Sequence, residues 1–400
     1  MNKKQFLTLL ALVLVVGGLG LYFHGNTGAG GGRTGRSSGQ KVLADFNIND
    51  VAAILIRQSQ GEVNLRKKGE IWTVAEREDY PAGFSQISEF IIKMHDLKPA
   101  QSMEVGVSQR GRLEVEEPGA AKSAKSGTLV EFRGADGKPV SHFVLGKAHT
   151  HGGAEASQFG DGGWPDGRYV LPSADSAVVD LVSDPISSAE PKPDQWLDKE
   201  FFKIEKPQSI SLESPVATNS WKVVRETESG EWKLDAPKAG EVLDSSKAGS
   251  LSSGLSSPSF SDVVTNAMSV KSNLASGTRV SFQTFDHFRY DLTVATNSAD
   301  NSYLTVKVSA DFPKAREPGQ NEKPEDKARL DKEFGEKQKA LEEKLKHERT
   351  FEKWVYQVSK WTIDSVVKDR GQLLVEKKVE KKDDAKSPDS NPAIIPSIPK

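Results

Sequence analysis

The chain has 400 residues, a formal net charge of −2 and no cysteine. This length predicts two or three domains, and the balanced charge gives no electrostatic case for a nucleic-acid binder, which usually shows a basic face. The absence of cysteine excludes thiolate catalysis, disulfides and cysteine-ligated zinc.

The N-terminus predicts a membrane anchor. Lys3 and Lys4 precede an apolar run over residues 6–23, which reaches the ~17–25 residues needed to cross a bilayer. The lysines favour a cytoplasmic N-terminus, and the run exceeds the ~7–15 residues of a cleaved signal core. We therefore expect an uncleaved signal-anchor over residues 1–24, with a cleaved signal as the alternative, and a flexible glycine-rich linker over residues 25–41. The bulk of the chain would then stand in the periplasm on a single-pass helix of the inner membrane.

Residues 42–182 predict a first unit made of strands and one helix. Apolar residues alternate or cluster in short runs separated by glycine-containing turns. The expected strands are 50–57, 63–66, 71–74, 128–133, 140–145 and 168–171. Ser85 is the expected N-cap of an amphipathic helix that ends before Pro99, and residues 176–182 read as a short helix or turn. The proline-rich residues 183–196 form the expected linker to a second unit.

The chain then repeats itself. The Phe46-Asn-Ile48 start returns as Phe202-Lys-Ile204, and Trp72 and Trp232 stand in similar Gly-Glu settings. A repeat of this length is a signal of architecture, so residues 197–375 predict a second unit of the same order. Its expected strands are 210–212, 221–225, 232–234, 279–284, 289–295 and 303–308, and Asp244 is the expected N-cap of its helix. We expect both tryptophans to be core anchors; a sugar-stacking platform is the alternative.

A charged insertion interrupts the second unit at residues 322–349. It holds equal numbers of acidic and basic residues, with Leu330, Phe334, Leu341 and Leu345 as a sparse apolar stripe. This composition predicts a solvated helix, or a helical hairpin broken at Gly335. A second interpretation is a docking arm that forms a coiled coil with a partner helix.

The motif Tyr169-Val-Leu171 returns as Tyr356-Gln-Val358, on the far side of this insertion. We therefore expect the strands that carry these two motifs to be equivalent. Residues 376–400 predict a disordered tail.

Catalytic motifs are missing from the sequence. It has no P-loop, no Gly-x-Ser-x-Gly elbow, no His-Glu-x-x-His and no isolated pair of carboxylates. His149-Thr-His151 lies in a glycine-rich loop near Asp161 and Asp166; it could bind a metal, but a polar surface loop is the interpretation we favour. Trp164 in the same loop is the candidate contact residue. We assign no catalytic, cofactor-binding or metal-binding residue, and expect a protein that is not an enzyme.

Several of these features together resemble a known family. The anchor, the Phe-x-Ile and Val-x-x-Ile start, the Gly-x-x-Trp-x-Val strand and the Tyr-Val-Leu strand are similar to membrane-anchored bacterial envelope proteins of a domain-of-unknown-function family (DUF4340-like). The resemblance covers residues 42–182 and 197–375. It implies genes that lie beside gliding-motility-type ABC transporters, and it carries no catalytic residues.

We therefore expect an α+β protein of two tandem related units, each an antiparallel sheet covered by a helix, after an N-terminal transmembrane helix. The leading hypothesis is a non-enzymatic accessory or scaffold of an ABC-type transport or gliding-related complex. The alternative is a periplasmic module that binds a glycan or cell-wall ligand in a cleft between the units, with Trp164, His149 and His151 as candidate contacts. The sequence requires no cofactor and leaves the oligomeric state open.

Overall fold

A computed structural model describes residues 40–119, 126–150, 164–318 and 322–376. The expected transmembrane segment 1–24, nearly all of the linker 25–41 and the tail beyond residue 376 lie outside the described residues. Among the helices in the described part of the chain, none is long and apolar enough to span a bilayer. The described fold consists of two antiparallel sheets with few helices, as the sequence predicted for an α+β protein.

The first sheet has nine strands in the order β4-β3-β2-β1-β6-β7-β8-β9-β5. These strands are β1 Ala53–Gln58, β2 Gly61–Lys68, β3 Ile71–Val74, β4 Tyr80–Pro81, β5 Gln101–Glu104, β6 Thr128–Arg133, β7 Pro139–Thr150, β8 Pro165–Leu171 and β9 Val178–Val182. In the middle of this sheet Ile56 lies opposite Val63 on one side and Val130 on the other. All three side chains are buried, as the alternation of apolar residues in a half-buried sheet requires.

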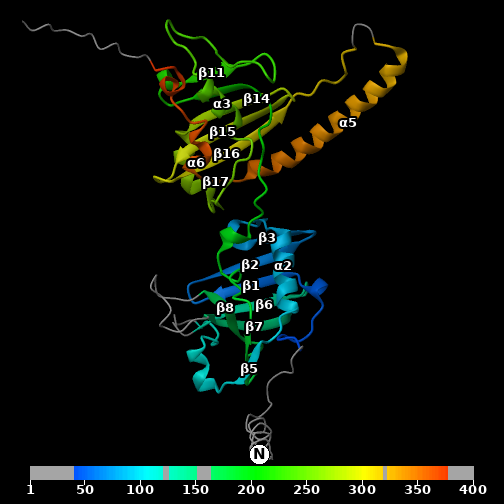
Figure 1. Ribbon diagram of the computed structural model, residues 1–400, viewed down its shortest axis with the longest axis vertical. Helices are drawn as coiled ribbons and strands as arrows, with labels where there is room; N and C mark the ends of the chain where they lie inside the picture. The colour runs from blue at the N-terminus through cyan, green and yellow to red at the C-terminus, as the bar shows by residue number, and fades with distance from the viewer. Residues whose placement is uncertain (1–39, 120–125, 151–163, 319–321, 377–400) are drawn as a thin grey trace, which may run out of the picture.

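Helix α2, Phe84–His95, covers this sheet (Figure 1). Its buried side chains are Ile87, Phe90, Ile91 and Met94. The ring of Phe90 meets the rings of Phe132 on β6 and of Trp196, with centroids 6.0 Å and 5.4 Å away. Trp196 ends the 3₁₀ turn η4, Pro193–Trp196, so the last residue of the expected linker 183–196 packs on the helix of the first unit. The helix is capped by Gly83 and not by Ser85.

The second sheet has eight strands in the order β12-β11-β10-β14-β15-β16-β17-β13. These strands are β10 Pro207–Glu213, β11 Trp221–Val224, β12 Lys233–Leu234, β13 Asp262–Val263, β14 Thr278–Thr284, β15 Phe288–Thr296, β16 Asn301–Ala310 and β17 Tyr356–Ser359. Its helices are α3 Ser245–Ser253, α4 Lys271–Ala275, α5 Pro324–Glu348 and α6 Lys360–Asp364. Asp244 caps α3 as expected, accepting hydrogen bonds from the amides of Ser246 and Lys247.

The two sheets share one strand order. Apart from the extra edge strand β4, each sheet begins with the first three strands of its unit in reverse order and continues with the last four strands in chain order. The far edge of each sheet is β5 or β13, a strand that lies in sequence between these two groups. This order corrects one expected equivalence. Strand β17, which carries Tyr356, pairs with β16 and β13 and so corresponds to β9, not to β8 with its Tyr169.

Strand β9 is itself a second correction, because we expected a helix or turn at residues 176–182. Val179 and Val182 are buried, and the strand closes the sheet between β8 and β5. The charged insertion therefore interrupts the connection from β16 to β17. In the first unit the same connection, from β8 to β9, is a short turn at residues 172–177.

Aromatic side chains fill the junction between the two units. The ring of Tyr80 from β4 meets those of Phe260, Trp354 and Tyr356, with centroids 5.8 Å, 5.1 Å and 6.2 Å away. Arg77 forms a two-pronged ion pair with Asp262 across the same junction, at 2.6 Å and 2.8 Å. One continuous apolar core therefore runs through both units.

Candidate functional site

The predicted contact loop lies between β7 and β8. Trp164, just before β8, leaves 90% of its surface exposed. His149, near the end of β7, places Nδ1 2.7 Å from Oδ1 of Asp166, and its ring stands edge-on to Tyr169. His151 lies outside the described residues. The structure thus brings His149 to Asp166 and leaves Trp164 open to solvent, and the role of all three as contacts stays a prediction.

A metal site at this loop would need a third ligand beside His149 and Asp166. In the described part of the chain, no three histidine or acidic side chains are grouped closely enough to hold a metal ion. The side chains of His149 and Asp166 are both partly exposed to solvent. Such an arrangement is typical of a surface ion pair.

The two repeated tryptophans differ in burial. Trp72 on β3 is 5% exposed and belongs to the core, which confirms a structural role. Trp232, next to β12, only packs against the core from outside. The guanidinium of Arg225 lies over its ring at 4.8 Å, so one face of the indole is engaged in a cation–π contact.

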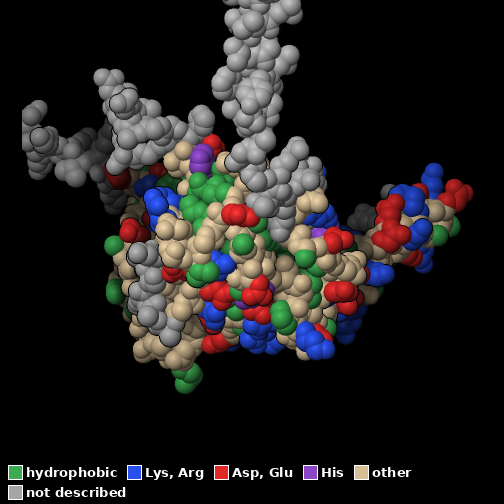
Figure 2. All heavy atoms as spheres, turned by 90° about the horizontal axis from the view of Figure 1, so that it is seen from below, with side chains coloured by type: hydrophobic (Ala, Val, Ile, Leu, Met, Phe, Trp, Pro, Cys, Tyr) green, Lys and Arg blue, Asp and Glu red, His purple; other side chains and the backbone are tan. Residues whose placement is uncertain are grey.

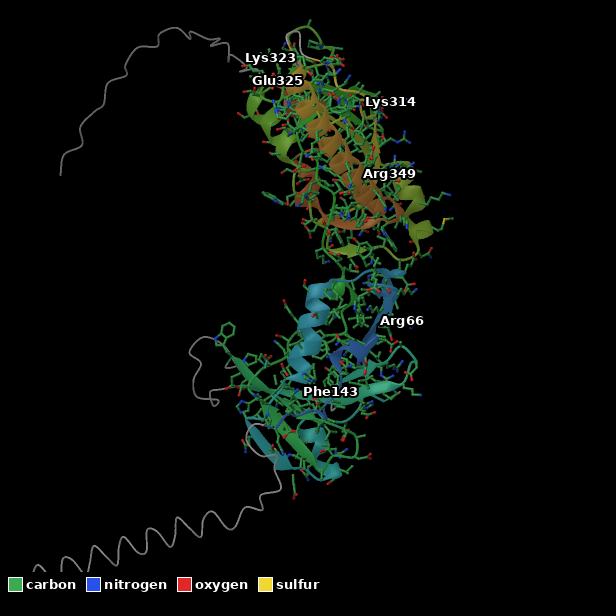
Figure 3. The ribbon with its side chains drawn as sticks, turned by 90° about the vertical axis from the view of Figure 1, so that its right-hand side faces the viewer. Arg66, Phe143, Lys314, Lys323, Glu325 and Arg349 are labelled. Carbon is green, nitrogen blue, oxygen red and sulfur yellow. The ribbon has the colours of Figure 1, made fainter. Side chains whose placement is uncertain are left out.

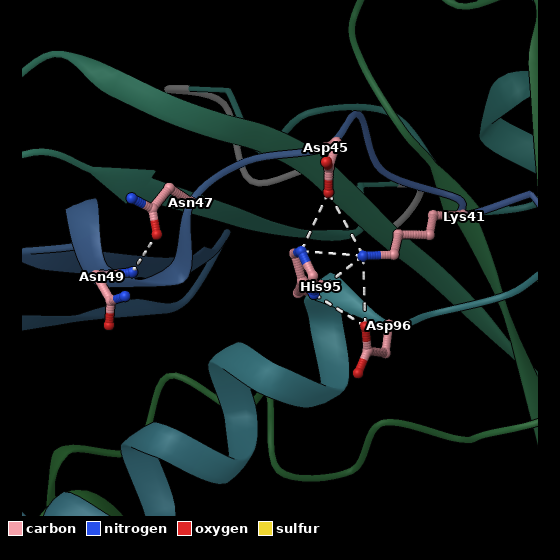
Figure 4. Close-up of polar contacts among 6 residues, drawn as sticks. All are labelled: Lys41, Asp45, Asn47, Asn49, His95 and Asp96. Carbon is pink, nitrogen blue, oxygen red and sulfur yellow. Dashed lines mark hydrogen bonds and ion pairs between the residues drawn. The ribbon is translucent and has the colours of Figure 1, made fainter.

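A second polar cluster lies where the chain enters the first unit (Figure 4). Nζ of Lys41 lies 3.4 Å from both Asp45 and Asp96. His95, at the end of α2, contacts the same two carboxylates at 3.1 Å and 2.9 Å. Hydrogen bonds from His95 and Lys41 lower the pKa of Asp96. These contacts fasten the first described residues to the end of α2, so the predicted linker would meet the body at a fixed point.

The insertion is the most distinctive feature of the second unit. It forms α5, one unbroken helix of 25 residues, about 37 Å long at 1.5 Å per residue. Gly335 does not break it, so of the two predicted forms the single helix is correct. Pro324 occupies its first turn with Glu325 and Asp326, and Lys346 and His347 stand in its last turn, which suits the helix dipole.

The C-terminal half of α5 is fastened to the sheet. Leu341 and Leu345 pack against the core. Lys344 forms an ion pair with Glu205 at 2.8 Å, and Lys337 forms one with Asp286 at 3.0 Å. Burial opposes the ionisation of Asp286, but Lys337 and Lys206 outweigh it and lower its pKa.

Glu348 forms the base of the arm. Only 4% of its surface is exposed, and its Oε2 has no hydrogen-bond partner among the described residues. Burial raises the pKa of this carboxyl, against the smaller opposing effects of Tyr290 and Lys344. Immediately after it, Arg349 donates to the carbonyl of Val308, while Glu352 accepts from the amide of the same residue.

The N-terminal half of α5 projects from the body (Figure 1), and Lys323 and Glu325 lie at the end of the helix opposite to Arg349 (Figure 3). Arg316 bridges Glu322 and Asp331 and so ties the preceding segment to this half. Leu330 and Phe334 are half-buried there. Acidic and basic side chains are intermixed on the projecting arm, on the right of Figure 2. The arm therefore offers a narrow apolar stripe inside a surface of balanced charge.

Comparison with known families places the chain. A model described as a domain of unknown function (DUF4340) matches residues 72–276, just over half of the sequence. The chain belongs to this family. No curated protein and no solved structure matches it.

The DUF4340 match does not coincide with either unit. It begins at Trp72 on β3 and ends just after α4, so it spans the junction and takes in part of each sheet. Helix α5 lies beyond it, as does α6. The arm is thus a feature of this chain outside the matched region.

Proposed function

We propose that this DUF4340 protein is a non-enzymatic accessory or scaffold of a membrane complex, held at the inner membrane by residues 1–24 with its two tandem related units in the periplasm. The observation that carries the proposal is α5. A helix about 37 Å long is held against the sheet along its C-terminal half, and its projecting half carries the half-buried Leu330 and Phe334 among balanced charges. Mixed-charge helices with a narrow apolar seam are suited to pairing with another helix.

The resemblance supplies the candidate partner, an ABC-type transporter component. We expect Leu330 and Phe334 to dock on a helix of that component, because burying both side chains would remove apolar surface from water. The charges around the stripe would select partner and register more than they would add affinity.

The experiment is affinity purification of the full chain from its native membranes after mild crosslinking. Wild type should recover a transporter subunit, and the double substitution Leu330→Ser with Phe334→Ser should lower that recovery at least tenfold. The matched control is Lys332→Ser with Glu336→Ser, an exposed ion pair two residues further along the same helix. The control should recover as much as wild type.

Two outcomes would contradict different parts of the proposal. If wild type recovers no transporter subunit, the scaffold function fails. If the stripe variant recovers as much as wild type, the complex stands but α5 has no part in it.

Binding of a periplasmic glycan is the second candidate, and the high exposure of Trp164 favours it. The cleft between the units that this hypothesis invoked is occupied by the rings around Tyr80, so the loop alone would form the site. Sedimentation of the full chain with isolated peptidoglycan tests it. Loss of binding in Trp164→Ala is the expected result, and unchanged sedimentation of that variant would exclude the loop.

A further inference from the structure

A groove of about 580 Å³ lies on the second unit, between the C-terminal end of α3 and helix α6. Small-molecule sites in proteins are typically concave and ~300–1,000 Å³ in volume, so the groove is large enough for a ligand. Serine and threonine hydroxyls dominate its walls, among them Ser253, Ser257, Ser259 and Thr362. Each hydroxyl can both donate and accept a hydrogen bond.

Trp361 stands at the rim of this groove and leaves 87% of its surface exposed. The backbone that carries it is held in place: Ser359 caps α6 by accepting from the amide of Trp361, and Ile363 of the same helix is buried. Indole has a broad apolar face. A ligand that stacks on it must itself have an apolar face.

The walls of the groove are preformed. A Cβ on Gly254 would lie 2.1 Å from Oγ of Ser365. Gly254 follows α3 and Ser365 follows α6, so the ends of the two helices touch at a position that leaves no room for a side chain. Oγ of Ser365 is buried and has no hydrogen-bond partner among the described residues. Val366 and Leu251 anchor the two walls in the core. A ligand would therefore not have to open the groove.

The charge of the groove is balanced. Its lining holds one carboxylate, Asp364, and one ammonium, Lys368. A site for phosphate or nucleic acid would carry an excess of cations. Hydroxyl-rich walls, one acceptor carboxylate and an exposed indole instead suit a neutral ligand with many hydroxyls and apolar C–H faces.

We propose that this groove binds a neutral saccharide, with Trp361 stacked on one sugar face and the wall hydroxyls and Asp364 bonded to the sugar hydroxyls. The proposal does not rest on α5 or on the scaffold function. The groove at Trp361 in the second unit is a site separate from the loop at Trp164 in the first.

The experiment is calorimetric titration of the full chain in lipid nanodiscs, because sugar-headed detergents would compete. The probes are tetrasaccharides of N-acetylglucosamine, glucose in β-1,4 linkage and glucose in α-1,4 linkage, with a sulfated oligosaccharide as the charged comparison. At least one neutral probe should bind. Trp361→Ala should weaken it at least tenfold, Trp361→Phe should retain part of the affinity, and Asp364→Asn should weaken it severalfold.

Phe84→Ala is the matched control, since it removes another largely exposed aromatic ring, at the start of α2 in the first unit, and should leave the affinity unchanged. Sedimentation with isolated peptidoglycan then distinguishes a cell-wall polymer from a soluble oligosaccharide as the source of the sugar. The proposal is overturned if none of the neutral probes binds, if the sulfated probe binds more tightly than they do, or if Trp361→Ala binds like wild type.

Discussion

One ion pair holds the C-terminal end of the second unit in place. Arg370, near the C-terminal end of the described chain, donates three hydrogen bonds to Glu241, at 2.6 Å, 3.1 Å and 3.2 Å. The guanidinium lowers the pKa of Glu241 to about 2. Both side chains are largely shielded from solvent. We therefore expect this ion pair to contribute more to folding stability than the many exposed ion pairs of this protein.

Glu241→Gln should destabilise the second unit at neutral pH. A carboxyl whose pKa is lowered by folding stabilises the native state above its unfolded pKa, here 4.5, and loses that effect as pH falls through about 2. Urea denaturation should therefore show a difference between wild type and variant at about pH 7 that vanishes near pH 2. Glu226→Gln is the control, because its partner Lys233 is exposed. An equal loss in both variants would refute the special role of Glu241.

Glu348→Gln should have the opposite effect and stabilise the folded protein at neutral pH. Burial raises the pKa of Glu348, so its charge costs stability at neutral pH, and that cost disappears once acid protonates the carboxyl in both states. We expect the variant to melt at a higher temperature than wild type at about pH 7 and at the same temperature near pH 4. Glu343→Gln, exposed on the same helix, should change neither value. A variant that melts lower at neutral pH would mean that the carboxylate is held by favourable contacts.

At the scale of elements, periodicity located most strands and both covering helices, because half-buried strands and amphipathic helices carry their burial in the sequence. The pairing of β17 could not be read in this way. Its Tyr-x-Val motif resembles that of β8, and only hydrogen bonding to β13 distinguishes them. The groove beside Trp361 could not be predicted from the sequence either, because α3 and α6 lie far apart in the chain. They meet where Gly254 contacts Ser365, and no sequence pattern reports that contact.

Gly254, which follows the last residue of α3, and Gly249 within that helix test this close approach. Gly254→Ala should push Ser365 away and destabilise the second unit by about 1–3 kcal/mol, the usual cost of overpacking. Gly249→Ala, inside α3 with nothing within 4 Å of the added methyl, should stabilise it by about 0.5–1 kcal/mol through helix propensity. Chemical denaturation of both variants measures the contrast. Equal effects would show that α3 and α6 are not in close contact at Gly254.

At the scale of the whole molecule, the junction determines whether two units behave as one. The ring of Tyr80 is 2% exposed and lies among rings of the second unit, and Arg77 adds an ion pair to Asp262. Because apolar contacts cross the junction without a break, unfolding one unit would expose the core of the other. The two units should therefore unfold in a single cooperative transition.

Tyr80→Ala should break that coupling. Removing a buried aromatic ring costs about 3–5 kcal/mol, and here the loss falls on the contact between units, so calorimetry should show two transitions in place of one. Leu65→Ala is the control, because it removes a comparable buried side chain inside the first sheet. It should lower the single transition without splitting it. Two transitions in wild type would contradict the coupling.

Val308 has a further consequence for the arm. The chain leaves the sheet just beyond this residue and returns to it through Arg349 and Glu352, which bind its carbonyl and amide. These two contacts secure the base of α5 at Val308, while Lys337 and Lys344 hold its C-terminal half against the second unit. The free lever is then the projecting half, residues 324–336, about 20 Å long, and a rotation of about 10° moves its tip by about 3.5 Å. A partner that holds the tip would thus transmit force to the second sheet through the ion pairs of Lys337 and Lys344 as well as through Val308.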